Sequence, residues 1–206
     1  MPQAYHGKVT TQGQSTEVGF SVLDRPDTVA RLFLGLPVPL LMRTKLAEAA
    51  RQHFGTYFGA LLPEENWHLT LFFFGDVKNH AQYLGRLQQP LPQAFVPTIS
   101  LTHLGRGAQR HQLWAYVNPT PALLSLRENL SERLRKIHFP LPIDSKKFIP
   151  HIHLANFYPT VSGLGLADVS LPAVYATQEA HLYQSTSTPQ GSHYDAIATI
   201  AFGNRH

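Results

Sequence analysis

Two stretches of the sequence repeat one pattern and decide the fold: RLFLGLPVPLLMRTKLAEAARQHF at residues 31–54 and QLWAYVNPTPALLSLRENLSERLRKIHF at residues 112–139. Each begins with a short apolar run typical of a buried strand and passes through a turn that contains proline. Each then continues with apolar residues three or four positions apart, which draws one apolar stripe along a helix. The sequence therefore predicts two copies of a strand–helix unit.

The second copy also carries helix boundary signals. Its strand is predicted at residues 113–117, matching residues 32–36 of the first copy. Thr120 is a candidate N-cap, and Pro121 then occupies the first helical position, where its missing N–H costs nothing. Pro140 is expected to stop the helix.

After each predicted helix a second strand begins with a histidine. The two segments are NWHLTLFFFG at residues 66–75 and PHIHLANF at residues 150–157. His68 and His151 lie 83 residues apart, while the first strands of the two copies are offset by 81. The copies thus stay in register over a strand–helix–strand unit, and a duplication of this kind is expected to form two lobes whose histidines face each other across a groove.

The order of these elements indicates an α+β protein. We expect a bilobal, duplicated fold in which two mainly antiparallel sheets flank a central groove and helices lie on the outside. The repeat covers residues 31–75 and 112–157, within a single domain at residues 29–206. Further elements are predicted as a helix at residues 80–91 and strands at residues 95–104, 174–184 and 193–202.

The composition excludes several classes of protein. The chain has 206 residues, 43% of them hydrophobic, with no cysteine. A disulfide framework, a thiolate zinc site and a cysteine nucleophile are therefore excluded. Seventeen Lys and Arg against 13 Asp and Glu give a formal charge of +4, which tolerates anionic partners without requiring them. Twelve histidines are the one compositional hint of chemistry near neutral pH.

The first 28 residues are polar and bury little. We expect residues 1–28 to be a disordered extension or a marginal hairpin around Gly13. The segment lacks the apolar core of a secretory signal, and no apolar stretch reaches the roughly 20 residues of a membrane span. A cytoplasmic protein without a membrane partner is expected.

The two histidine motifs indicate acid–base chemistry. Side chains at i and i+2 of a strand share one face, so His68 lies beside Thr70, and His151 beside His153. One imidazole then takes a proton from an attacking oxygen while the other gives a proton to a leaving oxygen, and either histidine suits either role. The i+2 groups would hold phosphoryl oxygens. This set suits hydrolysis of a phosphodiester without a metal or another cofactor.

Several segments resemble one known family. HLTL at 68–71, HIHL at 151–154, the opening RLFLGLP, the FFG after the first motif, FIPHI and LYQS…GSHY at 182–194 are similar to the bacterial and archaeal RNA 2′,3′-cyclic phosphodiesterases. These are also called the 2′-5′ RNA ligase family, within the 2H phosphoesterase superfamily. The resemblance runs from residue 31 to about residue 202.

The resemblance implies an activity and roles for four residues. The expected reaction is hydrolysis of an RNA or oligonucleotide 2′,3′-cyclic phosphate end to a 2′-phosphomonoester, without metal. By position, His68 would be the proton donor to the 3′-oxygen and His151 the proton acceptor that activates water. Thr70 and His153 would bind the phosphate. The protein is expected to act as a monomer.

The second motif departs from the family pattern. His153 stands where the family has threonine, and Ala155 and Asn156 follow where an arginine is common. An imidazole still donates a hydrogen bond, so phosphate binding could persist with a different pH dependence. Lys146 and Lys147 would supply charge instead, unless they form a solvated lysine pair.

Other interpretations remain open at this stage. The chain could act on another cyclic or 2′-5′ linked nucleotide, such as a 2′-5′ oligoadenylate or an ADP-ribose cyclic phosphate. It could bind a metal through His151, His153 and other histidines, or be a catalytically weak RNA-binding module. Tyr194 either reaches the groove or packs as a strand residue, and Trp67 and Trp114 are expected in the core.

Overall fold

The computed structural model describes residues 28–91, 96–108, 111–141, 147–161, 165–189 and 191–203. The predicted extension at residues 1–28 falls almost wholly outside the described residues. No helix in the described ranges is long and apolar enough to cross a membrane. The elements in chain order are β1 (Val29–Pro37), α1 (Leu40–Phe54), β2 (Phe58–Leu61), η2 (Glu64–Asn66), β3 (His68–Lys78), α2 (Ala81–Leu87), β4 (Thr98–Arg106), β5 (Gln112–Val117), α3 (Pro121–Lys136), β6 (His151–Phe157), η3 (Pro159–Val161), β7 (Val169–Ala176), β8 (Glu179–Thr188) and β9 (Gly191–Ala201).

The boundaries of α3 follow from its sequence. The Thr120 hydroxyl accepts a hydrogen bond from the Leu123 N–H at 3.3 Å, which confirms the predicted N-cap, and Pro121 is the first helical residue. The helix ends at Lys136, earlier than Pro140 alone would require. His138 has a φ of 57°, and this left-handed conformation turns the chain out of the helix before the proline is reached.

The strands form an antiparallel sheet with two halves, which confirms the α+β class. In the described part of the chain the sheet has nine strands. Eight of them follow the order β7-β4-β5-β6-β3-β1-β8-β9, and the ninth, β2, pairs with β6. The register records one pair, Leu69 opposite Ile152, between β3 and β6. The two expected sheets are therefore joined at this single pair into one sheet, because the two histidine-bearing strands lie next to each other.

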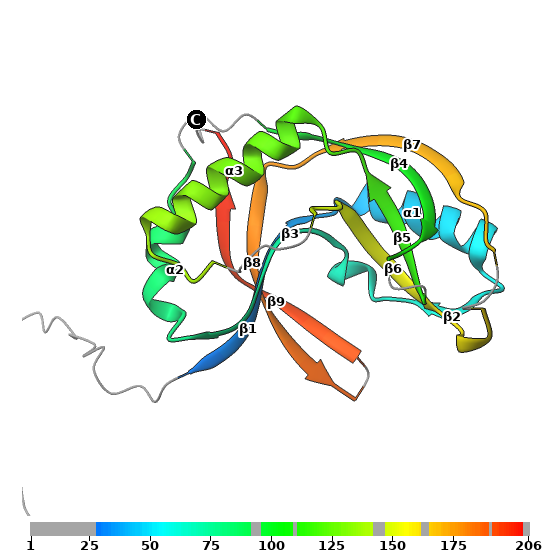
Figure 1. Cartoon of the computed structure of the whole chain (residues 1–206), viewed down its shortest axis with the longest axis horizontal. Helices are drawn as coiled ribbons and strands as arrows, with labels where there is room; N and C mark the ends of the chain where they lie inside the picture. The colour runs from blue at the N-terminus through cyan, green and yellow to red at the C-terminus, as the bar shows by residue number, and fades with distance from the viewer. Residues whose placement is uncertain are drawn as a thin grey trace, which may run out of the picture.

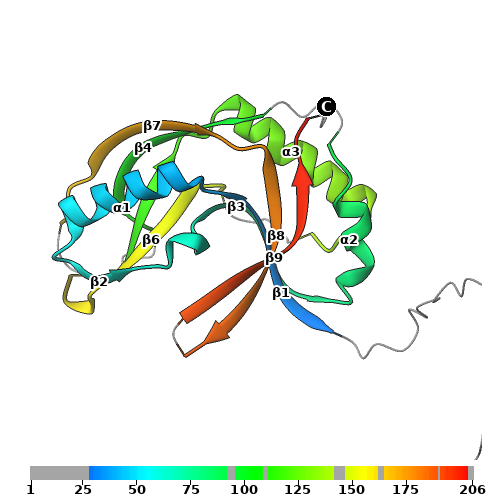
Figure 2. The same cartoon turned by 180° about the vertical axis from the view of Figure 1, so that it is seen from behind.

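The helices are exchanged between the halves. Figure 1 and Figure 2 both show α1 beside β5 and β6, whereas α2 and α3 lie beside β1, β8 and β9. The rings of Phe54 in α1 and Phe157 in β6 are 6.1 Å apart. At the other half, Arg127 of α3 donates from Nε to the Leu71 carbonyl of β3 at 3.2 Å. Each copy of the repeat thus covers the strands of the other copy, and a common core joins them.

Three elements differ from the prediction. Helix α2 is shorter than residues 80–91, and β4 begins and ends later than residues 95–104. The strand expected at residues 174–184 is instead the end of β7 and the start of β8. The chain turns at Thr177, which is buried and donates from Oγ1 to the Glu179 carbonyl at 3.0 Å. This corner is set by burial against the body of the protein, so the alternation of apolar residues does not reveal it.

Candidate active site

The two histidine motifs meet at the junction of β3 and β6. Leu69 of β3 pairs with Ile152 of β6. Because side chains alternate along a strand, the neighbours of these two residues point to the opposite face of the sheet, where they share one space. That space is a cavity of about 430 Å³. It is lined by Leu62, Pro63, Asn66, His68, Thr70, Gln112, His151, His153, Asn156, Gly191, Ser192 and Tyr194. The structure therefore brings together all four residues that the sequence singles out.

His68 is held by its backbone and by aromatic neighbours. Its Nδ1 lies 2.6 Å from the carbonyl oxygen of Asn66. The ring stacks on Phe33 of β1 at 4.5 Å between centroids, and Tyr194 of β9 meets it edge-on at 5.4 Å. A carbonyl accepts only from a protonated nitrogen, so Nδ1 carries the hydrogen and Nε2 of the neutral ring has a free lone pair.

His151 is held in the same way in the second copy. Its Nδ1 lies 2.8 Å from the carbonyl oxygen of Ile149, again two residues earlier in the chain. Its ring stacks on Trp114 of β5 at 3.5 Å between centroids. Trp114 and Phe33 occupy corresponding strands of the repeat, so the duplication extends to the aromatic supports. Both imidazoles consequently have the same tautomer, with Nε2 free.

Burial favours the neutral form of these imidazoles. It lowers the pKa of His68 from 6.5 to about 4, and the nearby His151 and His153 lower that pKa further, against the raising effect of the Asn66 carbonyl. Burial also lowers the pKa of His151, and the Ile149 carbonyl partly opposes this. In the absence of an anion the site thus presents two proton acceptors.

His153 differs from the residue at the same place in the first motif. Its Nε2 lies 3.1 Å from both the carbonyl oxygen of Ala155 and Oδ1 of Asn156. Both partners are acceptors, so Nε2 carries the hydrogen. Burial lowers the pKa of His153, and in the neutral ring Nδ1 then accepts hydrogen bonds but donates none. Thr70, by contrast, keeps a hydroxyl that donates at any pH.

Asn66 of η2 and Ser192 of the β8–β9 hairpin also line the cavity, and the sequence motifs did not single them out. Asn66 is buried, and its Nδ2 donates to the Ser192 carbonyl at 3.0 Å, which ties η2 to the hairpin. Tyr194 packs on Phe33 and His68 and also lines the cavity, so both of its expected roles hold. The GSHY segment that contains Tyr194 was the available signal, since it lies in the resemblance.

The remaining candidates lie elsewhere. Lys147 is exposed and does not line the cavity, and Lys146 lies outside the described residues. Trp67 is buried in the core, as expected, and buried Trp114 supports His151. Within the described ranges, no group of three or more His, Asp or Glu side chains is arranged to hold a metal ion.

One curated protein is similar to the chain over most of its length. No family model matches the sequence. The RNA 2′,3′-cyclic phosphodiesterase of Thermotoga maritima is 28% identical over 181 residues, which is 84% of this chain and 95% of that protein.

The fold is shared with solved structures. TT0787 of Thermus thermophilus superimposes with a TM-score of 0.68 at 22% identity, covering 83% of this chain and 97% of that one. E. coli LigT complexed with 3′-AMP gives a TM-score of 0.65 at 22% identity, covering 86% and 100%. The chain is thus similar over most of its length to an RNA 2′,3′-cyclic phosphodiesterase, as the resemblance in its sequence indicates, and it shares its fold with LigT.

Proposed function

We propose that this protein hydrolyses the 2′,3′-cyclic phosphate at the end of an RNA or oligonucleotide to a 2′-phosphomonoester. The observation that carries the proposal is the pair His68 and His151, at equivalent positions of β3 and β6, each held at Nδ1 and both lining one cavity. The name of the Thermotoga maritima relative supports this substrate class. Two imidazoles that face one space can serve as the general base and the general acid of a displacement at phosphorus.

The proton transfers use the Nε2 atoms, because Nδ1 of each ring is held by a carbonyl oxygen. A water molecule attacks the phosphorus, and Nε2 of His151 takes its proton. The bond between phosphorus and the 3′-oxygen breaks, and Nε2 of His68 gives its proton to that oxygen. One water is consumed, the 2′-ester bond stays intact, and a 2′-phosphate is left. The family resemblance assigns the two roles in this order.

The phosphate itself prepares His68 for the donor role. His68 must be an imidazolium to give a proton, yet burial lowers its pKa to about 4 in the free protein. No lysine or arginine lines the cavity in the described part of the chain. An anionic phosphodiester next to the buried ring favours its charged form, as does the Asn66 carbonyl at Nδ1. Substrate binding is therefore coupled to proton uptake.

The test is hydrolysis of adenosine 2′,3′-cyclic phosphate by the wild type and by His68→Ala and His151→Ala. Loss of an acid or base costs roughly 10²–10⁴ in rate, so each variant should fall by that factor. His193→Ala is the matched control, because His193 is exposed on β9 and pairs with Asp195 at 3.1 Å, outside the cavity lining. Full activity in the two motif variants, or a 3′-phosphate product, would contradict the proposal.

The same assay separates the rival activities. A panel that contains 2′-5′ linked oligoadenylate and ADP-ribose cyclic phosphate shows which ester is opened fastest, and binding without turnover would indicate an RNA-binding module.

We propose that the reaction uses no metal, so added chelator should leave the rate unchanged. We also expect a monomer in the cytoplasm, and sedimentation of the active protein measures the first of these.

A further inference from the structure

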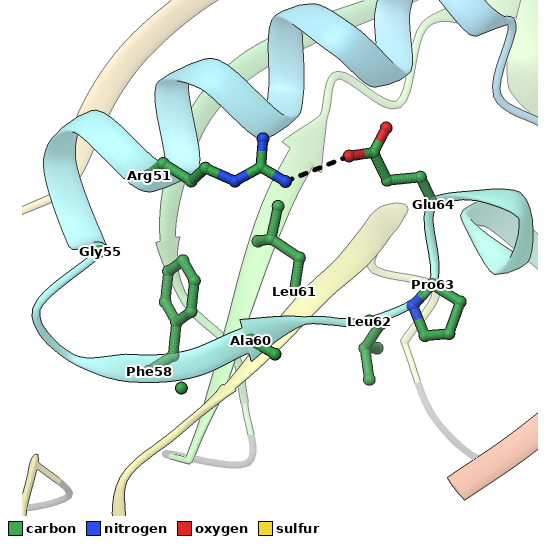
Figure 3. Close-up of a pocket in the computed structure, with 9 residues that line it drawn as sticks. Arg51, Gly55, Phe58, Ala60, Leu61, Leu62, Pro63 and Glu64 are labelled. Atoms are coloured by element: carbon green, nitrogen blue, oxygen red, sulfur yellow. Dashed lines mark hydrogen bonds and ion pairs between the residues drawn. The ribbon is translucent and has the colours of Figure 1, made fainter. Parts of the chain in front are cut away.

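A second cavity adjoins the candidate active site. It has a volume of about 480 Å³ and lies between α1 and the segment that runs through β2 to η2 (Figure 3). Its lining includes Arg51, Phe58, Leu61, Leu62, Pro63 and Glu64. Leu62 and Pro63 line both cavities. One wall therefore separates the histidine site from a neighbouring space of similar size.

This wall is fixed to the strand that carries the second histidine motif. The Leu62 N–H donates to the Leu154 carbonyl at 2.8 Å, directly after His153 in the chain. Strand β2 pairs with β6 through Phe58 opposite Phe157. Because these bonds attach the wall to β6, the second cavity keeps a fixed place relative to the two imidazoles.

The cavity combines apolar side chains with one cation, Arg51, and its acidic partner, Glu64. Figure 3 shows Leu61 pointing toward Arg51, with Phe58 on the same side and Leu62 turned the other way. The Arg51 guanidinium contacts Glu64 at 3.4 Å, and its side chain is 60% exposed. An exposed ion pair of this kind contributes little to the free energy of folding. A substrate anion can therefore replace Glu64 as the partner of Arg51 at a small cost in free energy. The planar fork of arginine matches phosphate oxygens.

The other nearby arginine is already occupied. Arg43 of α1 donates from Nε to the Val38 carbonyl at 2.8 Å, and its NH1 lies 3.5 Å from the Glu64 carbonyl. It holds the loop before α1 and the η2 turn in place. Arg51, by contrast, lines the cavity, and its ion pair with Glu64 is exposed and weak. Its guanidinium is therefore the one of these two that a substrate anion can bind.

We propose that the second cavity is a subsite for the nucleotide that precedes the cyclic phosphate in an RNA chain. Its base lies against the partly exposed Leu61, and the phosphodiester that links it to the terminal nucleoside contacts Arg51. This inference rests on the proposed function and adds a substrate preference: an oligonucleotide end is used better than a cyclic mononucleotide. Base contact with apolar side chains is tolerant of sequence, so little base preference is expected there.

The experiment compares an adenosine dinucleotide ending in a 2′,3′-cyclic phosphate with adenosine 2′,3′-cyclic phosphate. For the wild type, kcat/KM should be higher on the dinucleotide. In Arg51→Gln the ratio of dinucleotide to mononucleotide should fall about fivefold, the loss expected for one charge-assisted contact. The slope of log(kcat/KM) against log salt on the dinucleotide should also decrease by about 0.7, the value for one phosphate of a single strand. Glu64→Gln should raise the ratio.

The chain provides a matched control in α3. Arg135 contacts Glu128 at 3.3 Å in an exposed pair that lines neither cavity. Arg135→Gln should leave both the ratio and the salt slope unchanged. A wild-type ratio of one, or the same ratio in Arg51→Gln and Arg135→Gln, would overturn the subsite.

A binding measurement keeps this test separate from the proposed function. Calorimetry compares adenosine 2′-phosphate with the dinucleotide that ends in a 2′-phosphate, and it requires no turnover. If the wild type fails to hydrolyse either cyclic phosphate, the proposed function is wrong, and the affinity ratio of the two products still decides the subsite. Equal affinities in that comparison would overturn it.

Discussion

At position 153 a histidine occupies the place that Thr70 holds in the first motif. The two residues line the same cavity, but they differ as hydrogen-bond donors. The His153 Nε2–H is engaged by Ala155 and Asn156, and burial lowers the pKa of the ring. In the neutral state Nδ1 therefore offers a lone pair, which repels a phosphoryl oxygen, and only the acid form offers a second N–H.

His153→Thr should raise the rate in a pH-dependent way. Above the lowered pKa of His153 the wild-type ring is neutral, so the threonine hydroxyl adds a donor that the wild type lacks. A hydrogen bond contributes about 1 kcal/mol, and kcat/KM should rise about fivefold at pH 7 and above. Toward acid pH the advantage should shrink, because protonated His153 donates as well. A pH–rate profile of both proteins on adenosine 2′,3′-cyclic phosphate measures this, and a lower rate for the variant at every pH would show that the imidazole itself is required.

On the scale of elements, β1 helps to position His68 because a glycine, Gly35, lies under the imidazole ring. Gly35 lies between Thr70 on β3 and His181 on β8. A Cβ at this position would lie 3.1 Å from Cδ2 of His68 and 3.1 Å from the Leu69 carbonyl oxygen. The imidazole thus lies directly over the glycine, and the open space above this backbone is part of how the strand orients the ring.

Gly35→Ala should therefore displace His68 while the sheet stays folded. Misplacement of a catalytic group by about 1 Å can cost up to 10² in rate, so kcat/KM should fall by roughly 10- to 100-fold. Gly85→Ala in α2 is the control, since a Cβ there meets nothing within 4 Å. That variant should keep full activity and gain about 0.5–1 kcal/mol in the free energy of unfolding. Unchanged activity in Gly35→Ala would show that His68 tolerates the added methyl group.

The elements also show what the sequence could predict. Alternation along β3 and β6 was enough to place His68 with Thr70 and His151 with His153, because the period of a strand fixes which residues share a face. The N-cap Thr120 was equally local. The contributions of Asn66 and Ser192 were not, since a hydrogen bond between these two residues, 126 positions apart in the chain, holds the hairpin at the cavity. Contacts between distant segments leave no periodic signal in one sequence.

For the whole molecule, the exchange of helices connects the two copies of the repeat. β3 and β6 share one paired position, so the sheet alone joins the halves weakly. Arg127 of α3 adds a hydrogen bond to Leu71, and its guanidinium lies 4.8 Å from the Phe72 ring and 4.7 Å from the Phe148 ring. Phe139, after α3, meets Phe74 of β3 at 4.7 Å. The second copy therefore supplies core packing to the strand that carries His68.

The two tryptophans allow this dependence to be measured. Trp67 precedes His68 in the first copy and is 2% exposed, while Trp114 lies in the second copy and is 7% exposed. In Trp114→Phe the fluorescence reports on Trp67, which directly precedes β3, and in Trp67→Phe on Trp114 in β5. Because each half is covered by a helix from the other copy, neither should unfold alone, and within each variant the fluorescence and far-UV circular dichroism midpoints in urea should coincide. A tryptophan signal that changes at lower urea than the circular dichroism would show that the halves unfold separately, and the single domain proposed for residues 29–206 would then be wrong.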